Sequence, residues 1–121
     1  MAAPLRGRTI LIVEDEPFIA LDMEATLSSA GAQVISVLPL EEAFEAAQNA
    51  DISAAVLDVN LGDEGDCAPL CEVLARRQVP FIFHTGYMDG DVIDKWPRPV
   101  VAKPSTQDEL LECLAGALSG R

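Results

Sequence analysis

Four short apolar segments of this chain are followed by polar residues that are able to take part in phosphoryl or metal chemistry. Carboxylates follow two of the segments, a hydroxyl follows the third and an ammonium follows the fourth: Glu14, Asp15, Glu16, Asp58, Thr85 and Lys103. Two carboxylates about 5 Å apart repel each other by roughly 3 kcal/mol at an effective dielectric near 20. A cluster of them therefore needs a cation, and hard oxygen ligands at an open site suit Mg²⁺.

The acidic turn at residues 14–16 has a simpler interpretation when it is taken alone, as an acidic loop that follows a strand. The same is true of a single polar residue after any other strand. Four polar strand ends in the right chain order favour a common site, because the carboxyl ends of parallel strands meet at one edge of a sheet.

The spacing of the apolar residues predicts the elements that position these side chains. Five short segments lack polar alternation, as is typical of strands buried on both faces, and they are residues 9–13, 33–37, 52–57, 79–83 and 100–102. Helical spacing is found between and after them, at residues 17–30, 41–48, 69–77 and 106–118. The last helix opens with a capping box, Thr106 to Glu109, and Gly31 is suited to end the first.

Strands that alternate with helices predict an α/β fold with a doubly wound parallel sheet of five strands. We expect the flavodoxin-like strand order 2-1-3-4-5, which places the first, third and fourth strands side by side. We expect one domain over residues 1–121, without an output domain.

The composition excludes several classes of protein. The chain has 20 acidic residues against 8 lysines and arginines, a formal net charge of −12, which repels nucleic acid. No segment approaches the roughly 20 apolar residues of a membrane span, and residues 1–8 do not read as a secretory signal. We therefore expect a cytoplasmic protein with no nucleic-acid or membrane partner.

The three cysteines do not form a convincing metal or disulfide pattern. Cys67 and Cys71 are four residues apart, Cys113 is distant, and the single histidine, His84, lies elsewhere in the chain. These residues do not have the spacing of a zinc site, so we interpret the thiols as reduced packing residues.

The chain resembles the receiver domain of two-component response regulators over essentially its whole length. The resemblance is carried by the acidic turn VEDE at 13–16, LDVNL at 57–61, Thr85-Gly86 and Ala102-Lys103-Pro104. Residues 80–87, PFIFHTGY, are similar to the signature of the FATGUY subfamily of single-domain receivers, with His84 where alanine is usual.

The resemblance implies a role for each site residue. Asp58 would accept a phosphoryl group from the phosphohistidine of a sensor histidine kinase. Asp15, Asp58 and the backbone carbonyl of Asn60 would hold Mg²⁺, with Glu14 completing the acidic pocket through water. Lys103 would pair with Asp58 and then with the phosphoryl group, through a Lys103-Pro104 bond that is cis in the family.

The Thr85 hydroxyl would move to a phosphoryl oxygen after transfer. Such a chain is a phosphoacceptor signalling domain, with self-catalysed phosphotransfer and autodephosphorylation only, and not an enzyme in the usual sense. Its partners would be the kinase and a downstream protein target or phosphotransfer protein. The output could be protein–protein signalling or action as a phosphate sink.

The chain departs from the family pattern after Thr85. Most receivers carry an aromatic residue three positions before the lysine, where this chain has Val100; Tyr87 is either a substitute switch residue or a partly exposed loop tyrosine. Only 14 residues separate Thr85 from Val100, and glycine and proline interrupt them, which predicts a short or irregular fourth helix and leaves the usual dimer face in doubt. We interpret His84 as a structural or pocket-rim residue and Trp96 as a packing anchor.

Two other functions remain open from the residues. A phosphatase of the haloacid dehalogenase type also uses an aspartyl phosphate and Mg²⁺, but it needs a second aspartate where this chain has Asn60, and an inserted cap. A pseudo-receiver that binds partners without phosphorylation is disfavoured by Asp15, Asp58, Thr85 and Lys103.

Overall fold

A five-stranded parallel sheet forms the centre of the molecule. The computed structural model describes residues 3–86 and 90–119, and its strands lie in the order β2-β1-β3-β4-β5, as predicted. The strands are β1 (Thr9–Val13), β2 (Gln33–Ser36), β3 (Ala54–Leu57), β4 (Phe81–Thr85) and β5 (Val100–Ala102). All four neighbouring pairs are parallel.

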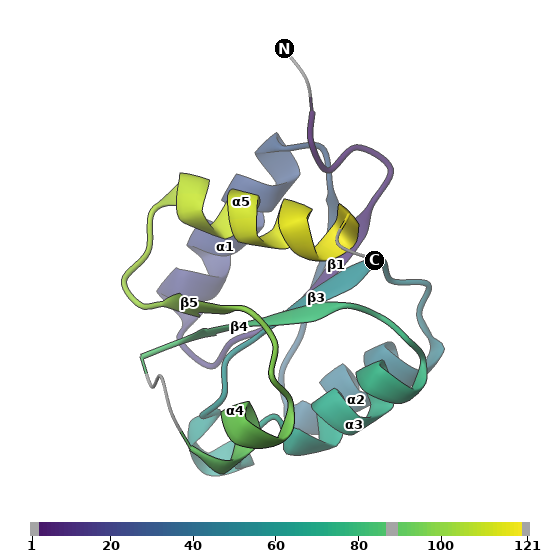
Figure 1. Cartoon of the computed structure of the whole chain (residues 1–121), viewed down its shortest axis with the longest axis vertical. Helices are drawn as coiled ribbons and strands as arrows, with labels where there is room; N and C mark the ends of the chain where they lie inside the picture. The colour runs from purple at the N-terminus through teal and green to yellow at the C-terminus, as the bar shows by residue number, and fades with distance from the viewer. Residues whose placement is uncertain (1–2, 87–89, 120–121) are drawn as a thin grey trace.

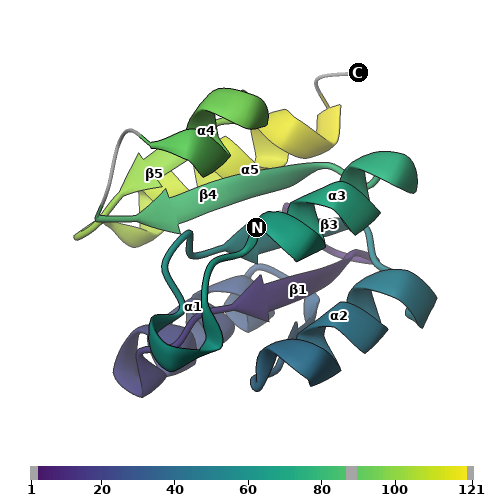
Figure 2. The same ribbon diagram turned by 90° about the horizontal axis from the view of Figure 1, so that it is seen from below.

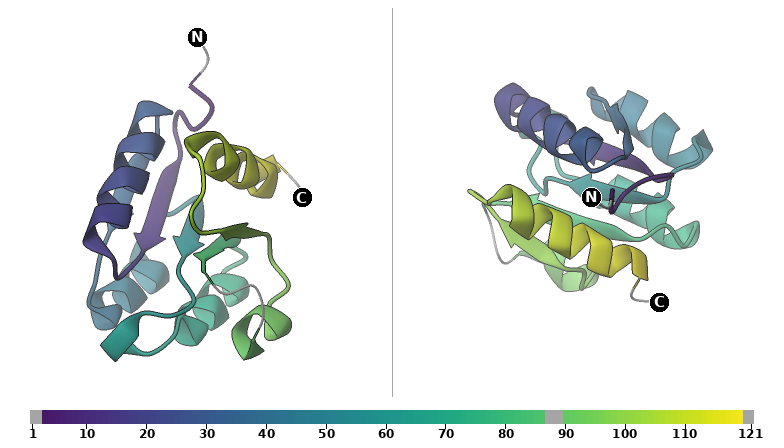
Figure 3. Two further views of the ribbon diagram at one scale, coloured as in Figure 1. Left: turned by 90° about the vertical axis from the view of Figure 1, so that its left-hand side faces the viewer. Right: turned by 90° about the horizontal axis from the view of Figure 1, so that it is seen from above.

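Helices cover both faces of the sheet (Figure 1). One face carries α1 (Pro17–Ser29) and α5 (Gln107–Ser119), which lie next to each other (Figure 3). The other face carries α2 (Leu40–Asn49), α3 (Ala68–Arg76) and the short α4 (Asp91–Lys95). The predicted doubly wound α/β fold is confirmed.

The alternation of side chains along the buried strands divides the core in two. In β1, Ile10 and Ile12 pack with Met23 and Leu27 of α1. Leu11 and Val13 of the same strand face the opposite cluster, which includes residues of α2, α3 and α4. Both faces of β1 are therefore apolar, which explains why its sequence shows no polar alternation.

Three strands differ from their predicted limits. The strand expected at 33–37 ends one residue early, at Ser36. The strand expected at 52–57 begins at Ala54, and the strand expected at 79–83 runs from Phe81 to Thr85. The shift of β4 follows from its pairing, since His84 lies opposite Val101 and Thr85 opposite Ala102. Both polar residues are therefore held inside the strand rather than in the loop after it.

Local sequence signals end and begin the two longest helices. After α1, Gly31 adopts φ +102°, and a Cβ there would lie 3.0 Å from both Ala3 Cβ and Arg6 backbone atoms, so only glycine fits. At the start of α5 the predicted capping box is formed. Thr106 N–H donates to Glu109 Oε1 at 2.7 Å, and Glu109 N–H donates to Thr106 Oγ1 at 3.1 Å.

The fourth helix is short, as predicted. It has five residues, of which Val92 is buried, and it follows Gly90 at φ +128°. Trp96, which directly follows it, is half-buried against the cluster that includes α2 and α3, in agreement with its interpretation as a packing residue.

The cysteines are free thiols. Cys67 and Cys71 are both buried at the start of α3, with their sulfur atoms 3.8 Å apart. Among residues 3–86 and 90–119, no helix is long and apolar enough to cross a membrane.

Candidate functional site

The polar residues after the strands meet at the carboxyl edge of the sheet. In Figure 2 the arrows of β1 and β4 point to the same side of the molecule. Backbone hydrogen bonds extend the ladder beyond the strands, with Asp58 N–H donating to Val13 O and Lys103 N–H donating to Thr85 O, each at 2.9 Å. The ladder thus fixes where these residues leave the sheet.

Lys103 is shared between two buried carboxylates. Its Nζ lies 2.9 Å from Asp58 Oδ2, and 2.9 Å and 3.0 Å from Glu14 Oε1 and Oε2. The side chain of Glu14 is fully buried, and those of Asp58 and Lys103 are 7% and 19% exposed. An ammonium in such surroundings offsets the repulsion between two carboxylates that have lost most of their water.

A third carboxylate joins this pair from the solvent side. Glu14, Asp15 and Asp58 each offer one oxygen, and these oxygens lie within 4.8 Å of one another. Glu14 Oε2 also accepts a hydrogen bond from Glu16 N–H at 3.1 Å, and Oε1 is ion-paired with Lys103. Asp15 is exposed, and Asp58 keeps Oδ1 free of Lys103, so these two are the better placed to ligate a cation directly.

The loop after β3 forms one wall of the site. Asp15, Asp58, Asn60, Gly62, Gly86 and Lys103 line a shallow hollow. Asn60 N–H approaches Asp58 Oδ1 at 3.4 Å, and Asn60 Oδ1 accepts from Gly62 N–H at 2.9 Å. Gly62 has φ +64°, and a Cβ there would lie 3.1 Å from Asp15 Oδ2. Glycine therefore lets this loop pass close to the exposed carboxylate.

Burial and neighbouring charges shift the pKa values of Glu14 and Asp58 in opposite directions. Burial, together with the nearby Glu14 carboxylate, raises the pKa of Asp58 from 3.8 to about 6, although Lys103 opposes the shift. Burial alone would also raise the pKa of Glu14, but His84, Lys103 and Glu16 N–H outweigh it and lower that pKa to about 2. Glu14 and Asp58 together outweigh the effect of burial on Lys103 and raise its pKa above 10.5.

The donor set fits a hard divalent cation. With Glu14, Asp15 and Asp58 ionised, a single ammonium balances only one of three negative charges, and the remaining ligand atoms are carboxylate and amide oxygens. Burial and the Glu14 carboxylate raise the pKa of Asp58, so the site without a cation disfavours the ionised form of Asp58.

Comparison with known proteins agrees with this geometry. The family model described as the response regulator receiver domain matches residues 10–115. The chain belongs to this family. Receiver domains serve in two-component signalling and generally bind Mg²⁺ at an acidic pocket, and this receiver has such a pocket at Glu14, Asp15 and Asp58.

Individual relatives extend the match. The phyllosphere-induced regulator PhyR of Methylorubrum extorquens is 35% identical over 100 residues, which are 78% of this chain and 38% of that protein. The chain thus spans well under half the length of this curated relative. The solution structure of SdrG from Sphingomonas melonis Fr1 is 39% identical, with a TM-score of 0.79, over 98% of this chain and 99% of that one.

A CheY-like receiver domain from Methanospirillum hungatei JF-1 has a TM-score of 0.83 over 93% of this chain and 94% of that one. At 23% identity it shows the shared fold alone.

The receiver brings together most of the residues that the sequence singled out. Glu14, Asp15, Asp58 and Lys103 converge, and Thr85 is fully buried at the end of β4. Asn60 lines the same hollow, and the Lys103-Pro104 bond is cis. Tyr87, the other proposed switch residue, lies outside the described residues.

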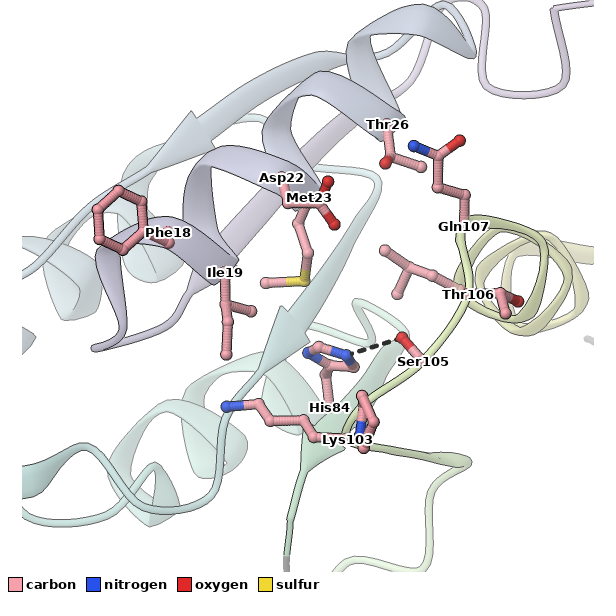
Figure 4. Close-up of a pocket in the computed structure, with 12 residues that line it drawn as sticks. Phe18, Ile19, Asp22, Met23, Thr26, His84, Lys103, Ser105, Thr106 and Gln107 are labelled. Carbon is pink, nitrogen blue, oxygen red and sulfur yellow. Dashed lines mark hydrogen bonds between the residues drawn. The ribbon is translucent and has the colours of Figure 1, made fainter.

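One pair of residues in this receiver was not predicted. His84 is buried, and its Nε2 lies 3.0 Å from Ser105 Oγ (Figure 4). Its Nδ1 lies 3.9 Å from Glu14 Oε1. Nothing in the sequence singled out Ser105. The sequence did single out His84, because the related signature has alanine at that position, and the structure places His84 next to the acidic pocket.

Proposed function

We propose that this receiver accepts a phosphoryl group on Asp58 from a sensor histidine kinase, in a Mg²⁺-dependent phosphorelay. The observation that carries the proposal is the Lys103 ammonium, 2.9 Å from Asp58 Oδ2, in a pocket that also holds Glu14 and Asp15. Phosphoryl transfer needs little beyond positioning and charge stabilisation, and these residues supply both.

The transfer would proceed by attack of a carboxylate oxygen of Asp58 on phosphorus. The new P–O bond forms as the P–N bond to the donor histidine breaks, and the imidazole nitrogen keeps the electron pair. Lys103 would stabilise the charge on the transferring oxygens, and the Thr85 hydroxyl would donate to one of them. Mg²⁺ held by Asp15, Asp58 and the Asn60 carbonyl would neutralise the same charge.

Asn60 favours an acceptor over a phosphatase. A phosphatase of the haloacid dehalogenase type has an acid two residues after its nucleophile, which gives and removes protons during turnover. The amide of Asn60 has no proton to transfer in this way, and its Oδ1 is already bonded to Gly62 N–H.

The output of this receiver would be binding to a downstream protein, transfer to a phosphotransfer protein, or removal of phosphoryl groups as a sink. The acidic surface, with a net charge of −12, supports a protein partner rather than nucleic acid. We place the protein in the cytoplasm with its kinase and propose that residues 1–121 act as one receiver domain. Thr85 and Tyr87 are the proposed switch residues.

Labelling with a small phosphodonor such as acetyl phosphate tests the proposal. Wild type should incorporate phosphate only with Mg²⁺, and the acid-stable, base-labile product should map to Asp58 by mass spectrometry. Asp58→Asn should abolish labelling, whereas Asp51→Asn, at an exposed acid before β3, should not change it. Undiminished labelling of Asp58→Asn would contradict the proposal.

A further inference from the structure

His84 is a buried side chain that the phosphoryl chemistry described above does not use. The residue is 4% exposed. Its ring lies between Glu14 on one side and Ser105 on the other, with Nδ1 3.9 Å from Glu14 Oε1 and Nε2 3.0 Å from Ser105 Oγ. Within the described residues, neither Nδ1 nor Glu14 Oε1 has a hydrogen-bond partner, although Oε1 is ion-paired with Lys103 at 2.9 Å.

The Glu14 carboxylate favours a proton on the ring nitrogen that faces it, Nδ1. If Nδ1 were bare, its lone pair would face a carboxylate oxygen in a fully buried place, and two facing acceptors repel. We assign a proton to Nδ1, with Nε2 bonded to the Ser105 hydroxyl. Figure 4 shows this bond beside the groove that α1 helps to line. His84 therefore aims an N–H at Glu14.

Lys103 divides its positive charge between two carboxylates. It donates hydrogen bonds to Glu14 Oε2 and Asp58 Oδ2, and its Nζ also lies 2.9 Å from Glu14 Oε1 as an ion pair. A phosphoryl group on Asp58 attracts the same ammonium, and movement of Nζ towards it weakens the contacts with Glu14. Glu14 would then be a fully buried carboxylate with less of its neutralising charge, which is unfavourable.

The His84 ring lies where it is able to receive the released carboxylate. A movement of about 1 Å would bring Nδ1 and Glu14 Oε1 from 3.9 Å into the range of a hydrogen bond, about 2.7–3.2 Å. Ser105 follows Lys103 by two residues, so the same segment positions both the lysine and the ring.

We propose that His84 is a positioning residue, which takes over the Glu14 carboxylate when Lys103 turns to the phosphoryl group on Asp58. The proposal rests on the proposed function, because it needs Asp58 to be the acceptor. His84 touches neither the phosphoryl group nor the proposed metal; it acts through Glu14 and Lys103. Replacing it should impair the phosphorylated state far more than the resting state.

Nuclear magnetic resonance of the imidazole tests the geometry directly. The chain has one histidine, so its ring signals need no assignment by mutation. In the resting protein, ¹⁵N shifts should report a proton on Nδ1. Addition of beryllofluoride with Mg²⁺ should move the Hδ1 resonance downfield and slow its exchange. A resting ring without a proton on Nδ1, or an Hδ1 signal that does not respond to bound beryllofluoride, would overturn the proposal.

Two variants separate the hydrogen bond from mere packing. His84→Asn places an amide N–H near the position of Nδ1, whereas His84→Leu fills the space without a donor. His84→Leu should weaken beryllofluoride binding about tenfold, a typical effect for a hydrogen bond to a charged group, and His84→Asn should recover most of it. Mg²⁺ affinity without beryllofluoride should be similar in both. Equal beryllofluoride affinity in the two variants would overturn the proposal.

The outcomes also separate this proposal from the proposed function. If wild type does not bind beryllofluoride, both fail. If wild type binds it and requires Asp58, but the His84 signals and the two variants are indifferent, only the role of His84 fails. If His84→Leu does not fold, the resonance measurement on wild type still decides.

Discussion

Lys103 Nζ contacts Glu14 at 2.9 and 3.0 Å as well as Asp58 at 2.9 Å, so the proposed phosphoacceptor shares its cation with a fully buried neighbour. Without a metal ion the ammonium is the principal charge that holds the two carboxylates together. A phosphoryl group on Asp58 would therefore compete with Glu14 for Lys103. The stability of the resting site also depends on this one side chain.

Lys103→Met should destabilise the metal-free protein. Two buried carboxylates lose their shared cation, and removing one partner of a buried pair costs about 3–5 kcal/mol. Because the Lys103 side chain is 19% exposed, we expect a cost just below this range, about 2–3 kcal/mol. Urea denaturation at pH 7 measures the effect. Lys95→Met removes an exposed lysine and should cost under about 1 kcal/mol.

The same variant should respond to pH and Mg²⁺ more strongly than wild type. In Lys103→Met the carboxyl pKa values rise in the folded state, so the folded protein binds protons more readily than the unfolded chain and gains stability as the pH falls from 7 towards 5. Mg²⁺ should restore part of the loss at pH 7. A variant as stable as wild type without metal would show that Lys103 does not compensate the two carboxylates.

Mg²⁺ should bind more weakly in acid because it competes with a proton on Asp58. The pKa of this carboxyl is raised to about 6, so below that pH most molecules carry a neutral acid that cannot ligate the ion. Affinity should fall about tenfold per pH unit below pH 6 and level off above pH 7, as measured by calorimetry. Asp58→Asn should remove this dependence.

The same pKa shift determines how the stability of the metal-free protein depends on pH. The folded pKa of Asp58, about 6, exceeds its ordinary value of 3.8, so this residue makes the fold less stable as the pH rises through the interval between them. Glu14 acts oppositely, since its pKa is lowered from 4.5 to about 2, and its contribution is lost as the pH falls through that lower interval. Saturating Mg²⁺ should abolish the loss due to Asp58.

The sequence could predict the site to the extent that chain order determines it. Asp58 and Lys103 each follow a buried apolar segment, and parallel strands bring their ends to one edge whatever the details of packing. Short patterns also placed the capping box at Thr106 and the end of α1 at Gly31, because both depend on contacts within a few residues.

Side-chain contacts between different strands could not be predicted from such short patterns. The contact of Lys103 with Glu14 joins residues 89 positions apart, and its geometry depends on side-chain lengths and burial at the same time. The bond from His84 to Ser105 depends on β4 extending to Thr85, two residues past the predicted limit, because pairing with β5 and not apolar composition sets that end.

Gly62→Ala should impair metal binding beyond its effect on stability. Gly62 has φ +64°, and its Cβ would lie 3.1 Å from Asp15 Oδ2; Gly65 has φ +99° with nothing within 4 Å of its Cβ. Both substitutions strain the backbone by about 1–2 kcal/mol. Only Gly62→Ala should displace Asp15 and weaken Mg²⁺ several-fold by calorimetry. Equal Mg²⁺ affinity in the two variants would mean that the contact with Asp15 is unimportant.

We expect the signal to leave the site through α4. This helix has five residues, and its ordered amides include Asp94 and Trp96, which donate to Gly90 O and Val92 O at 3.0 Å. A helix of this length is not stable by itself, and within it only Val92 is buried. Amide hydrogens of residues 94–96 should therefore exchange with solvent orders of magnitude faster than those of β3 in the resting protein.

Beryllofluoride with Mg²⁺ should slow this exchange. The Thr85 hydroxyl would move to the phosphoryl mimic and draw the backbone at Gly86 with it, and α4 would be held more tightly. With Val100 rather than an aromatic residue on β5, the response should be an ordering of α4, a shift of population between its frayed and packed forms. The buried amides of α5, such as Leu114, provide the internal control and should not change. Slow exchange at residues 94–96 before activation, or no change after it, would mean that the signal leaves by another surface.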